Sequence, residues 1–307
     1  MPVINLVVIT GKTVTKPQTS LESWIIDFLT DLKNANRSVH TCRAYASDLY
    51  RLASFYDGVP AAISVDILRD FLETFSHLKP ATRARKQAAL NSFFQWAYRQ
   101  DLIAANPMAK IEAVKRDEPQ IRALERKDAE NILAVIPAKQ TRDRLLFRLI
   151  FETGLRVGEA LQLYVEDLDM TLDDEHIYVR GKGGKRRTVL LDDSKLVAQL
   201  RRYLQQTGYK HGPLFRAQKN SRGGPLRYQS VQYRWQKYCE KAGIDCTLHQ
   251  LRHTHATEMV NEGVSLATIR KRLGHKNIQT TLRYAEKSDE SADAELRAWR
   301  RRKEGNS

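Results

Sequence analysis

Cysteine is scarce in this sequence, and the three that occur, Cys42, Cys239 and Cys246, form no CxxC pair. Neither a disulfide framework nor a cysteine zinc site is therefore indicated, and each thiol is expected to be a small buried side chain. An apolar run of about 20 residues, the length that spans a membrane, is also missing. The run Val3–Ile9 is short, is broken by Asn5 and has no basic leader before it. These absences predict a cytoplasmic protein without a membrane segment.

Signatures of nucleotide hydrolysis and of catalytic zinc are missing as well. The glycine-rich turn around Lys182 lacks the GxxxxGK[ST] pattern of a phosphate-binding loop. His249 and His253 stand one helical turn apart, but Gln250 occupies the place of the glutamate in HExxH, and no third ligand follows. The sequence has no clear Asp/Glu cluster at metal spacing either. We therefore expect no cofactor and no metal.

What the sequence does contain is an excess of positive charge. It has 51 Lys and Arg against 36 Asp and Glu, a formal net charge of +15 and a pI near 9.7. Such a balance favours a polyanionic partner, and charge alone does not choose among DNA, RNA and an acidic membrane. A membrane partner would need an apolar span or an anchored basic helix, and neither is present. The length of 307 residues favours about two domains.

The first domain is predicted to be all-α and to cover residues 19–105, after an N-terminal arm at 1–18. Thr19 and Glu22 form a capping-box pattern, and apolar residues then recur at helical spacing. Three further helix starts are predicted, at Ser38, Ser64 and Pro80.

A linker is predicted at 106–122, where prolines and lysines replace large apolar residues, and a second domain at 123–307. The helical pattern resumes at Leu124 and stops at Gly154. Between 175 and 191 the period changes to two around a glycine turn, which predicts a β-hairpin. Helical patterns then continue to about Arg302. The predicted fold class is therefore mainly α with a small β-sheet or hairpin in the second domain (α+β).

Several segments carry polar residues that could take part in catalysis or DNA binding. Each of these residues also has an ordinary structural explanation. Arg156 follows a tight glycine turn at a helix start, where an exposed arginine is common. Lys182 lies in a turn that is either a solvated loop or a phosphate cradle. His249 and Arg252 share one helical face in HQLRH. The stretch Leu266–Tyr284 also fits a helix-turn-helix with basic residues on its second helix.

Taken together, an Arg, a β-turn Lys, HxxRH, LGH and a Tyr nine residues after that His resemble the tyrosine recombinase family of phage-type integrases, Xer-like resolvases and recombinases of mobile genetic elements. The resemblance covers about 285 residues. It implies site-specific recombination of DNA, with Glu159 as a supporting carboxylate behind the pocket. The catalytic set that it implies is Arg156, Lys182, His249, Arg252, His275 and Tyr284.

The chemistry fits these residue types. Two arginines can give forked hydrogen bonds to a phosphodiester, which suits Arg156 and Arg252. A phenol is largely protonated at neutral pH, so Tyr284 needs a proton acceptor, for which His249 is the candidate. Lys182 is assigned as general acid for the departing 5′-hydroxyl, and His275 as a hydrogen-bond donor to the phosphate. The guanidinium charges take the place of a metal, and the phosphotyrosyl ester keeps the bond energy, so ATP is not needed.

The resemblance also implies a C-shaped clamp of both domains around a double-stranded core recombination site, and a homotetramer in the synaptic complex. Accessory proteins are compatible with it. The terminal helix Glu295–Lys303 would dock on a neighbouring protomer or form a frayed basic tail. Nine residues are candidates for phosphate contact, with ordinary solvated charge as the alternative: Arg83, Arg85, Lys86, Lys185, Arg186, Arg187, Arg270, Lys271 and Arg272.

Two other functions stay open. A non-catalytic DNA-binding regulator would use the helix-turn-helix-like segment and would tolerate Phe at position 284. A type IB topoisomerase would share the pocket and relax DNA without exchanging partners. Resolution, excision and integration are equally compatible with the residues.

Overall fold

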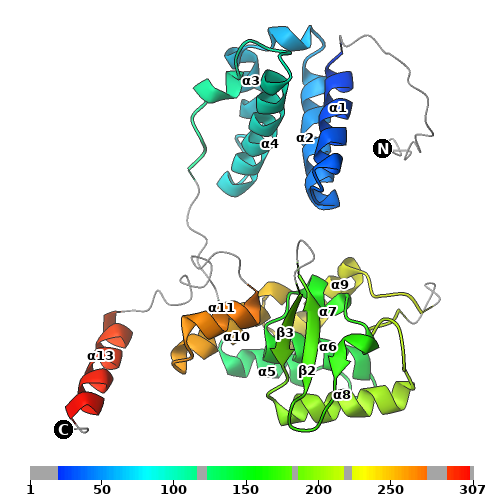
Figure 1. Ribbon diagram of the computed structural model, residues 1–307, viewed down its shortest axis with the longest axis vertical. Coiled ribbons are helices and arrows are strands. Elements are labelled where there is room, and N and C mark those ends of the chain that lie inside the picture. The colour runs from blue at the N-terminus through cyan, green and yellow to red at the C-terminus, as the bar shows by residue number, and fades with distance from the viewer. Residues whose placement is uncertain (1–19, 116–122, 182–185, 218–222, 275–288, 305–307) are drawn as a thin grey trace. The chain divides into compact units, whose positions relative to one another are not determined.

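The computed structural model describes residues 20–115, 123–181, 186–217, 223–274 and 289–304. The chain divides into two compact units, Met1–Pro119 and Gln120–Ser307, shown in Figure 1. The division falls inside the 106–122 segment, and the arm predicted at 1–18 lies outside the described residues. In the described part of the chain, no helix has the length and apolar character needed to cross a membrane.

The first unit consists of helices whose starts are set by polar caps. Serine hydroxyls at Ser20, Ser38 and Ser64 each accept a hydrogen bond from the backbone N–H three residues on. The predicted starts at Ser38, Ser64 and Pro80 are confirmed, whereas the predicted cap pair at Thr19 and Glu22 is wrong because Ser20 is the cap. The helices are α1 (Leu21–Asn34), α2 (Val39–Phe55), α3 (Val65–Glu73) and α4 (Pro80–Arg99), with short 3-10 turns at Pro60–Ala62 and Pro107–Lys110.

The core of this unit is rich in aromatic rings. Phe28 of α1 meets Phe93 of α4 edge to face, with ring centroids 5.5 Å apart, and Phe93 also meets Phe94 at 5.2 Å. Leu49 and Leu52 of α2 are fully buried beside them. The apolar spacing seen in the sequence therefore buries one face of each helix in a common core.

The second unit is built around α6, whose side chains are almost all buried. α6 packs against α8 and α10, and α5 packs against α9. The pattern between Leu124 and Ile150 forms two helices instead of one, because Pro137 lies between them. The helices are α5 (Arg126–Ala134), α6 (Thr141–Thr153), α7 (Val157–Leu161), α8 (Ser194–Thr207), α9 (Tyr228–Ala242), α10 (Leu248–Asn261), α11 (Leu266–Leu273) and α13 (Asp289–Glu304).

A small antiparallel sheet of order β1-β2-β3 completes this unit: β1 (Leu168–Asp169), β2 (His176–Arg180) and β3 (Arg186–Leu190). The predicted hairpin is confirmed, with Ile177 opposite Val189 and Arg180 opposite Arg186. β3 lies beside α11 (Figure 1). β1 was not expected, since two residues are too few to show an alternating pattern. The prediction of a mainly helical α+β chain is confirmed.

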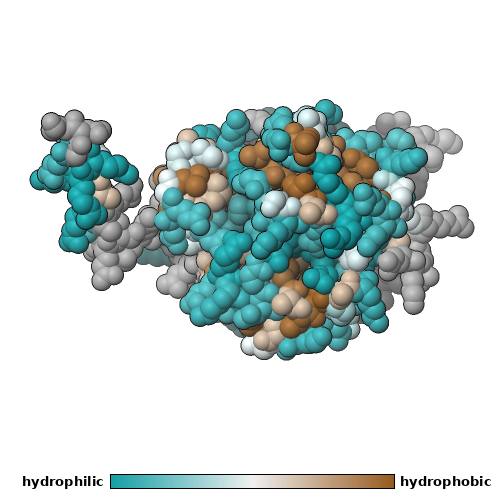
Figure 2. Space-filling model, turned by 90° about the horizontal axis from the view of Figure 1, so that it is seen from below, coloured by the Kyte–Doolittle hydropathy of each residue, from teal (hydrophilic) through white to brown (hydrophobic). Residues whose placement is uncertain are grey.

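The surface view in Figure 2 is largely hydrophilic, with separate apolar patches. Such patches are ordinary on protein surfaces, because polar atoms do not cover a whole surface. Both units have large apolar side chains that are exposed. Among the described residues these include Val59, Tyr98, Tyr233, Leu296 and Trp299.

Candidate active site

Arg156 stands at the N-cap of α7, directly after the turn that ends α6. Its Nη1 donates to Glu159 Oε1 at 3.0 Å, and its backbone N–H donates to Glu159 Oε2 at 2.9 Å. The Arg156 side chain is nevertheless 44% exposed. One edge of this guanidinium is therefore held by protein while the side chain still reaches solvent.

Arg252 lies on α10 and is 1% exposed. Its Nη1 donates to the Gly154 carbonyl at 2.5 Å, and its Nη2 donates to the Leu273 carbonyl at 2.8 Å. Arg156 Nη1 lies 3.5 Å from the same Leu273 carbonyl. Residues from α7 and α10, far apart in sequence, thus bring two guanidinium groups to one backbone oxygen at the end of α11.

Gly154 is required at the turn between α6 and Arg156. Its φ is +63°, and a Cβ there would lie 2.6 Å from Leu273 Cδ2 and 2.7 Å from His255 Cδ2. A side chain at this position would therefore meet both backbone strain and a clash. The sequence predicts that a helix ends at Gly154. Because this glycine has no side chain, the turn that it forms also lets the start of α7 lie close to α10 and α11.

Glu159 is the buried carboxylate of this cluster. Arg187 donates to both of its oxygens, at 3.0 and 2.9 Å, and Arg252 Nη1 lies 4.0 Å away. Burial alone would raise the pKa of Glu159, but the hydrogen bonds from Arg187 and from the Arg156 backbone, with the charges of both side chains, lower it to about 2. Glu159 is therefore ionised and balances the surrounding guanidinium groups.

The free energy of unfolding of a Glu159→Gln variant is expected to be about 3 kcal/mol lower than that of wild type at neutral pH. The folded pKa of Glu159, about 2, lies below its ordinary value of 4.5, so its stabilisation is complete above that ordinary value and is lost as pH falls through the folded pKa. Urea titrations at stepped pH should show a difference from wild type that is constant between about pH 7 and 5 and shrinks toward pH 3. A difference that does not change with pH would show that the carboxylate charge is not its cause.

His249 is an exposed residue of the first turn of α10, on the same helix as Arg252. The part of its ring that contacts protein loses water, and this desolvation, followed by the positive charges of Arg252 and Arg156, lowers the pKa of His249 below its ordinary value. A neutral imidazole at neutral pH can accept a proton, which is what a general base requires. His253 meets His249 with ring centroids 4.4 Å apart, and no cluster of three or more metal-binding side chains occurs among the residues that the structure describes.

Lys182, Lys185, His275 and Tyr284 lie outside the described residues. The structure does fix the elements on either side of them. Lys182 falls in the connection between β2 and β3, and His275 follows Gly274, the left-handed residue that ends α11. Three of the six predicted catalytic residues, Arg156, His249 and Arg252, are thus placed in the structure, and they lie in the same unit.

The predicted phosphate contacts on α4 divide into two kinds. Lys86 is buried, donates to Asp48 Oδ1 at 2.7 Å and lies 4.1 Å from the centre of the Phe75 ring. In this conformation its ammonium group is enclosed and paired, which gives no support to its assignment to DNA. Arg85 is exposed and forks onto the same Asp48, while Arg83 is half-buried. Asp48 was not singled out in the sequence, although a charge beside Leu49 on an apolar helix face was a signal.

The candidates of the second unit divide in the same way. Arg187 is 13% exposed and is held by Glu159, and Arg272 is 10% exposed. Arg272 donates to the carbonyls of Leu190 and Glu152, to Asp192 and to His255 Nε2. In this conformation protein acceptors occupy both side chains, which gives no support to either one as a DNA phosphate contact. Three candidates are exposed: Arg186, Arg270 and Lys271.

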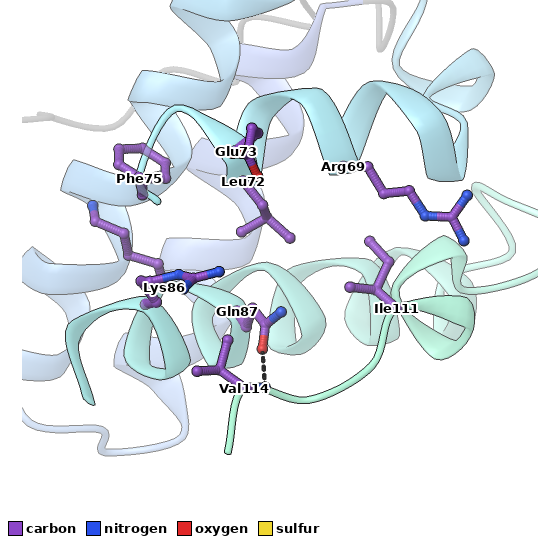
Figure 3. Close-up of a pocket in the computed structure, with 9 residues that line it drawn as sticks. Arg69, Leu72, Glu73, Phe75, Lys86, Gln87, Ile111 and Val114 are labelled. Carbon is purple, nitrogen blue, oxygen red and sulfur yellow. Dashed lines mark hydrogen bonds between the residues drawn. The ribbon is translucent and has the colours of Figure 1, made fainter. Parts of the chain in front are cut away.

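A pocket of about 300 Å³ lies in the first unit, between α3, α4 and residues 111–114. Figure 3 shows Leu72 and Phe75 on one side of it and Gln87 and Val114 on the other. Gln87 Oε1 accepts from the Val114 backbone N–H at 2.9 Å, and Gln87 Nε2 donates to the Glu112 carbonyl at 3.2 Å. The side chain of Gln87 thereby holds the residues that leave this unit against α4.

Comparison with known families gives two matches. Residues 122–291 match the profile described as the phage integrase family, and residues 25–101 match the phage integrase N-terminal SAM-like domain. Among curated proteins, the chain is 30% identical over 283 residues to tyrosine recombinase XerC of Thermodesulfovibrio yellowstonii, covering 87% of this chain and 92% of the relative.

Solved structures share the fold. The XerH site-specific recombinase bound to its difH substrate aligns with a TM-score of 0.73 and 21% identity, over 94% of this chain and 98% of that chain. A lambda integrase tetramer bound to a Holliday junction aligns with a TM-score of 0.73 and 19% identity, over 89% of this chain and 80% of that chain. The chain therefore belongs to the phage integrase family and is a site-specific tyrosine recombinase.

Proposed function

We propose that this recombinase cleaves and rejoins DNA strands through a 3′-phosphotyrosyl intermediate formed by Tyr284. The observation that carries the proposal is the convergence of Arg156 and Arg252 on the Leu273 carbonyl, with Glu159 behind them. Fixed guanidinium groups can stabilise the charge that develops on the non-bridging oxygens of a phosphodiester, without reorganising during the reaction. This site would therefore favour phosphoryl transfer to a nucleophile brought beside it.

Proton transfer completes the reaction. His249, whose pKa is lowered, would take the proton of the Tyr284 hydroxyl. Lys182 would give a proton to the departing 5′-hydroxyl, and His275 would donate a hydrogen bond to the phosphate. The phosphotyrosyl ester conserves the energy of the broken bond, so attack by a 5′-hydroxyl of the partner strand reseals the backbone without ATP. Because the guanidinium charges act on the phosphate directly, the reaction should proceed without a metal.

The partner we propose is a double-stranded core site, held in a clamp formed by the two units and recombined within a homotetramer. The recombinase would then act in the cytoplasm. Accessory proteins are compatible with this assembly. The difH-bound XerH and the lambda integrase tetramer on a Holliday junction support this reading by analogy. Leu296 and Trp299 of α13 are exposed apolar side chains that would dock on a neighbouring protomer. The phosphate contacts that remain proposed are Arg83, Arg85, Lys185, Arg186, Arg270 and Lys271.

The test is covalent trapping. Wild-type protein is incubated, with EDTA present, with nicked fragments of the DNA that flanks its own gene. We expect an SDS-resistant adduct at a 3′-phosphate, and peptide mapping should place it on Tyr284. An adduct at a 5′-phosphate, or on another residue, would overturn the proposed mechanism.

The alternatives give other outcomes. A non-catalytic regulator would bind fragments without forming an adduct on any of them. A type IB topoisomerase would form the adduct and relax supercoiled DNA, but it would not exchange strands between two sites. A two-site assay that counts recombinant products therefore separates the topoisomerase from the recombinase. Whether the recombinase resolves, excises or integrates DNA depends on whether the two sites lie on one DNA molecule or on two, and on their relative orientation.

A further inference from the structure

Arg187 occupies an unusual position for a basic residue of a surface hairpin. It lies on β3, yet its side chain is 13% exposed. Nη1 and Nη2 donate to the two oxygens of Glu159, at 3.0 and 2.9 Å, and Nε donates to the Arg272 carbonyl at 2.9 Å. The guanidinium group therefore directs both its fork and its Nε–H into the protein.

The turn at the end of α11 packs directly on this side chain. A Cβ on Gly274 would lie 2.9 Å from Arg187 Nη1 and 3.0 Å from Arg187 Cζ. Gly274 also has a φ of +64°, so a glycine is needed there for both space and conformation. Arg187 is thus in close contact with the residue that precedes His275 in the sequence.

Three parts of the site meet at Arg187. β3 continues the hairpin whose connection contains Lys182, Glu159 belongs to α7 and also binds Arg156, and the carbonyl of Arg272 belongs to α11. Glu159 Oε1 accepts from both Arg156 and Arg187, and Glu159 Oε2 accepts from Arg187 and the Arg156 backbone. The position of the carboxylate, and through it that of the Arg156 guanidinium, depends on the fork of Arg187.

We infer that Arg187 is a positioning residue of the strand-cleavage reaction: it holds Glu159 against Arg156 and ties the hairpin to the end of α11. This inference rests on the proposed function. Arg187 acts through Glu159 and touches no reacting atom. An ammonium group cannot replace it, because a lysine cannot make two parallel hydrogen bonds to the carboxylate and a third to a carbonyl in the same fixed geometry.

The test compares Arg187→Gln and Arg187→Lys with Arg201→Gln. Arg201 is a matched control in the same unit, since it also pairs with a buried carboxylate, Glu175 at 2.7 Å, and donates to a carbonyl, that of Met170 at 3.0 Å. For each protein, the rate of adduct formation is measured at saturating protein on a nicked fragment that wild type cleaves. The affinity for that DNA and the melting temperature are measured beside it.

We expect Arg187→Gln to lower the cleavage rate about 100-fold, the size of effect produced by a misplaced catalytic group. Its DNA affinity should stay within about threefold of that of Arg201→Gln, since no phosphate contact is lost. Arg187→Lys should recover only part of the rate. On the acid side of its pH–rate profile the rate should also fall more steeply than in wild type, because Glu159, without the hydrogen bonds that lower its pKa most, is protonated closer to the pH at which His249 is protonated. Arg201→Gln should leave the rate and the acid side of the profile unchanged.

Two results would overturn the inference. One is cleavage by both Arg187 variants at the rate of Arg201→Gln. The other is a loss of DNA affinity well beyond threefold relative to Arg201→Gln, which would make Arg187 a phosphate contact. If Arg187→Gln fails to fold, the folded Arg187→Lys variant decides by the same rate and pH readouts. Failure of wild type to form any adduct would instead overturn the proposed function, and this inference with it.

Discussion

A Tyr284→Phe variant is expected to form no covalent adduct with DNA while it binds the same DNA with unchanged affinity. Phenylalanine keeps the ring and removes only the oxygen that attacks the phosphorus, so every contact to the backbone phosphates remains. Removal of a nucleophile commonly lowers turnover by at least about a thousandfold, and here it also removes the atom of covalent attachment. The measurement is the yield of SDS-resistant adduct on a nicked fragment, beside a gel-shift titration.

A matched control is Tyr233→Phe. Tyr233 is an exposed tyrosine of α9, in the same unit, with Lys237 above its ring at 5.0 Å. Phenylalanine preserves that ring contact, so adduct formation should equal that of wild type. Equal yields of adduct from wild type and from the Tyr284→Phe variant would show that Tyr284 is not the nucleophile.

Arg156→Lys and Arg252→Lys should each lower the rate of adduct formation about 10² to 10³-fold, since each replaces a forked cation with a point charge at the phosphate. Their stabilities should differ. Arg252 is 1% exposed and donates to two carbonyls, so its replacement removes a donor from the buried Gly154 carbonyl and leaves the Leu273 carbonyl with only the 3.5 Å contact from Arg156; an unpaired buried acceptor costs about 1–3 kcal/mol. Arg156 is 44% exposed, so Arg156→Lys should lose activity with little loss of stability.

Single-turnover cleavage and urea denaturation of the same preparations measure the two effects. An Arg180→Lys variant controls for the loss of an exposed arginine, because Arg180 pairs with Asp167 at the outer end of β2 and is 56% exposed. If the Arg156→Lys variant cleaves DNA at the wild-type rate, Arg156 does not act on the phosphate. If the Arg252→Lys variant has the wild-type free energy of unfolding, the two carbonyl contacts of Arg252 contribute little to stability.

Much of the fold was predictable because its signals are local. A serine that can cap the backbone N–H three residues on, followed by apolar residues at helical spacing, indicates where a helix starts, as at Ser38 and Ser64. An alternation of apolar residues over five positions was enough to predict the paired strands β2 and β3. β1 gave no such signal, because its two residues acquire a strand conformation only by pairing with β2.

The candidate site was predictable in its residue types and less so in its geometry. The sequence determined the order of the Arg, Lys, HxxRH, LGH and Tyr motifs, and with it the family resemblance. It could not tell which basic side chains face solvent, because helical or strand spacing gives the face of a residue and not its partner. Nothing in the sequence indicated the carboxylate partners of Lys86 and Arg187.

Only the tertiary structure decided those partners. It brought Asp48 to Lys86 across 38 residues and Glu159 to Arg187 across 28 residues. A buried charge is tolerated only where an opposite charge and hydrogen bonds compensate for the lost water, and such partners come from packing between distant elements. Local sequence therefore determined the helices, the hairpin and the set of chemical groups. The packing of α7, α10, α11 and β3 decided which of those groups remain open to a phosphate and which hold the others in place.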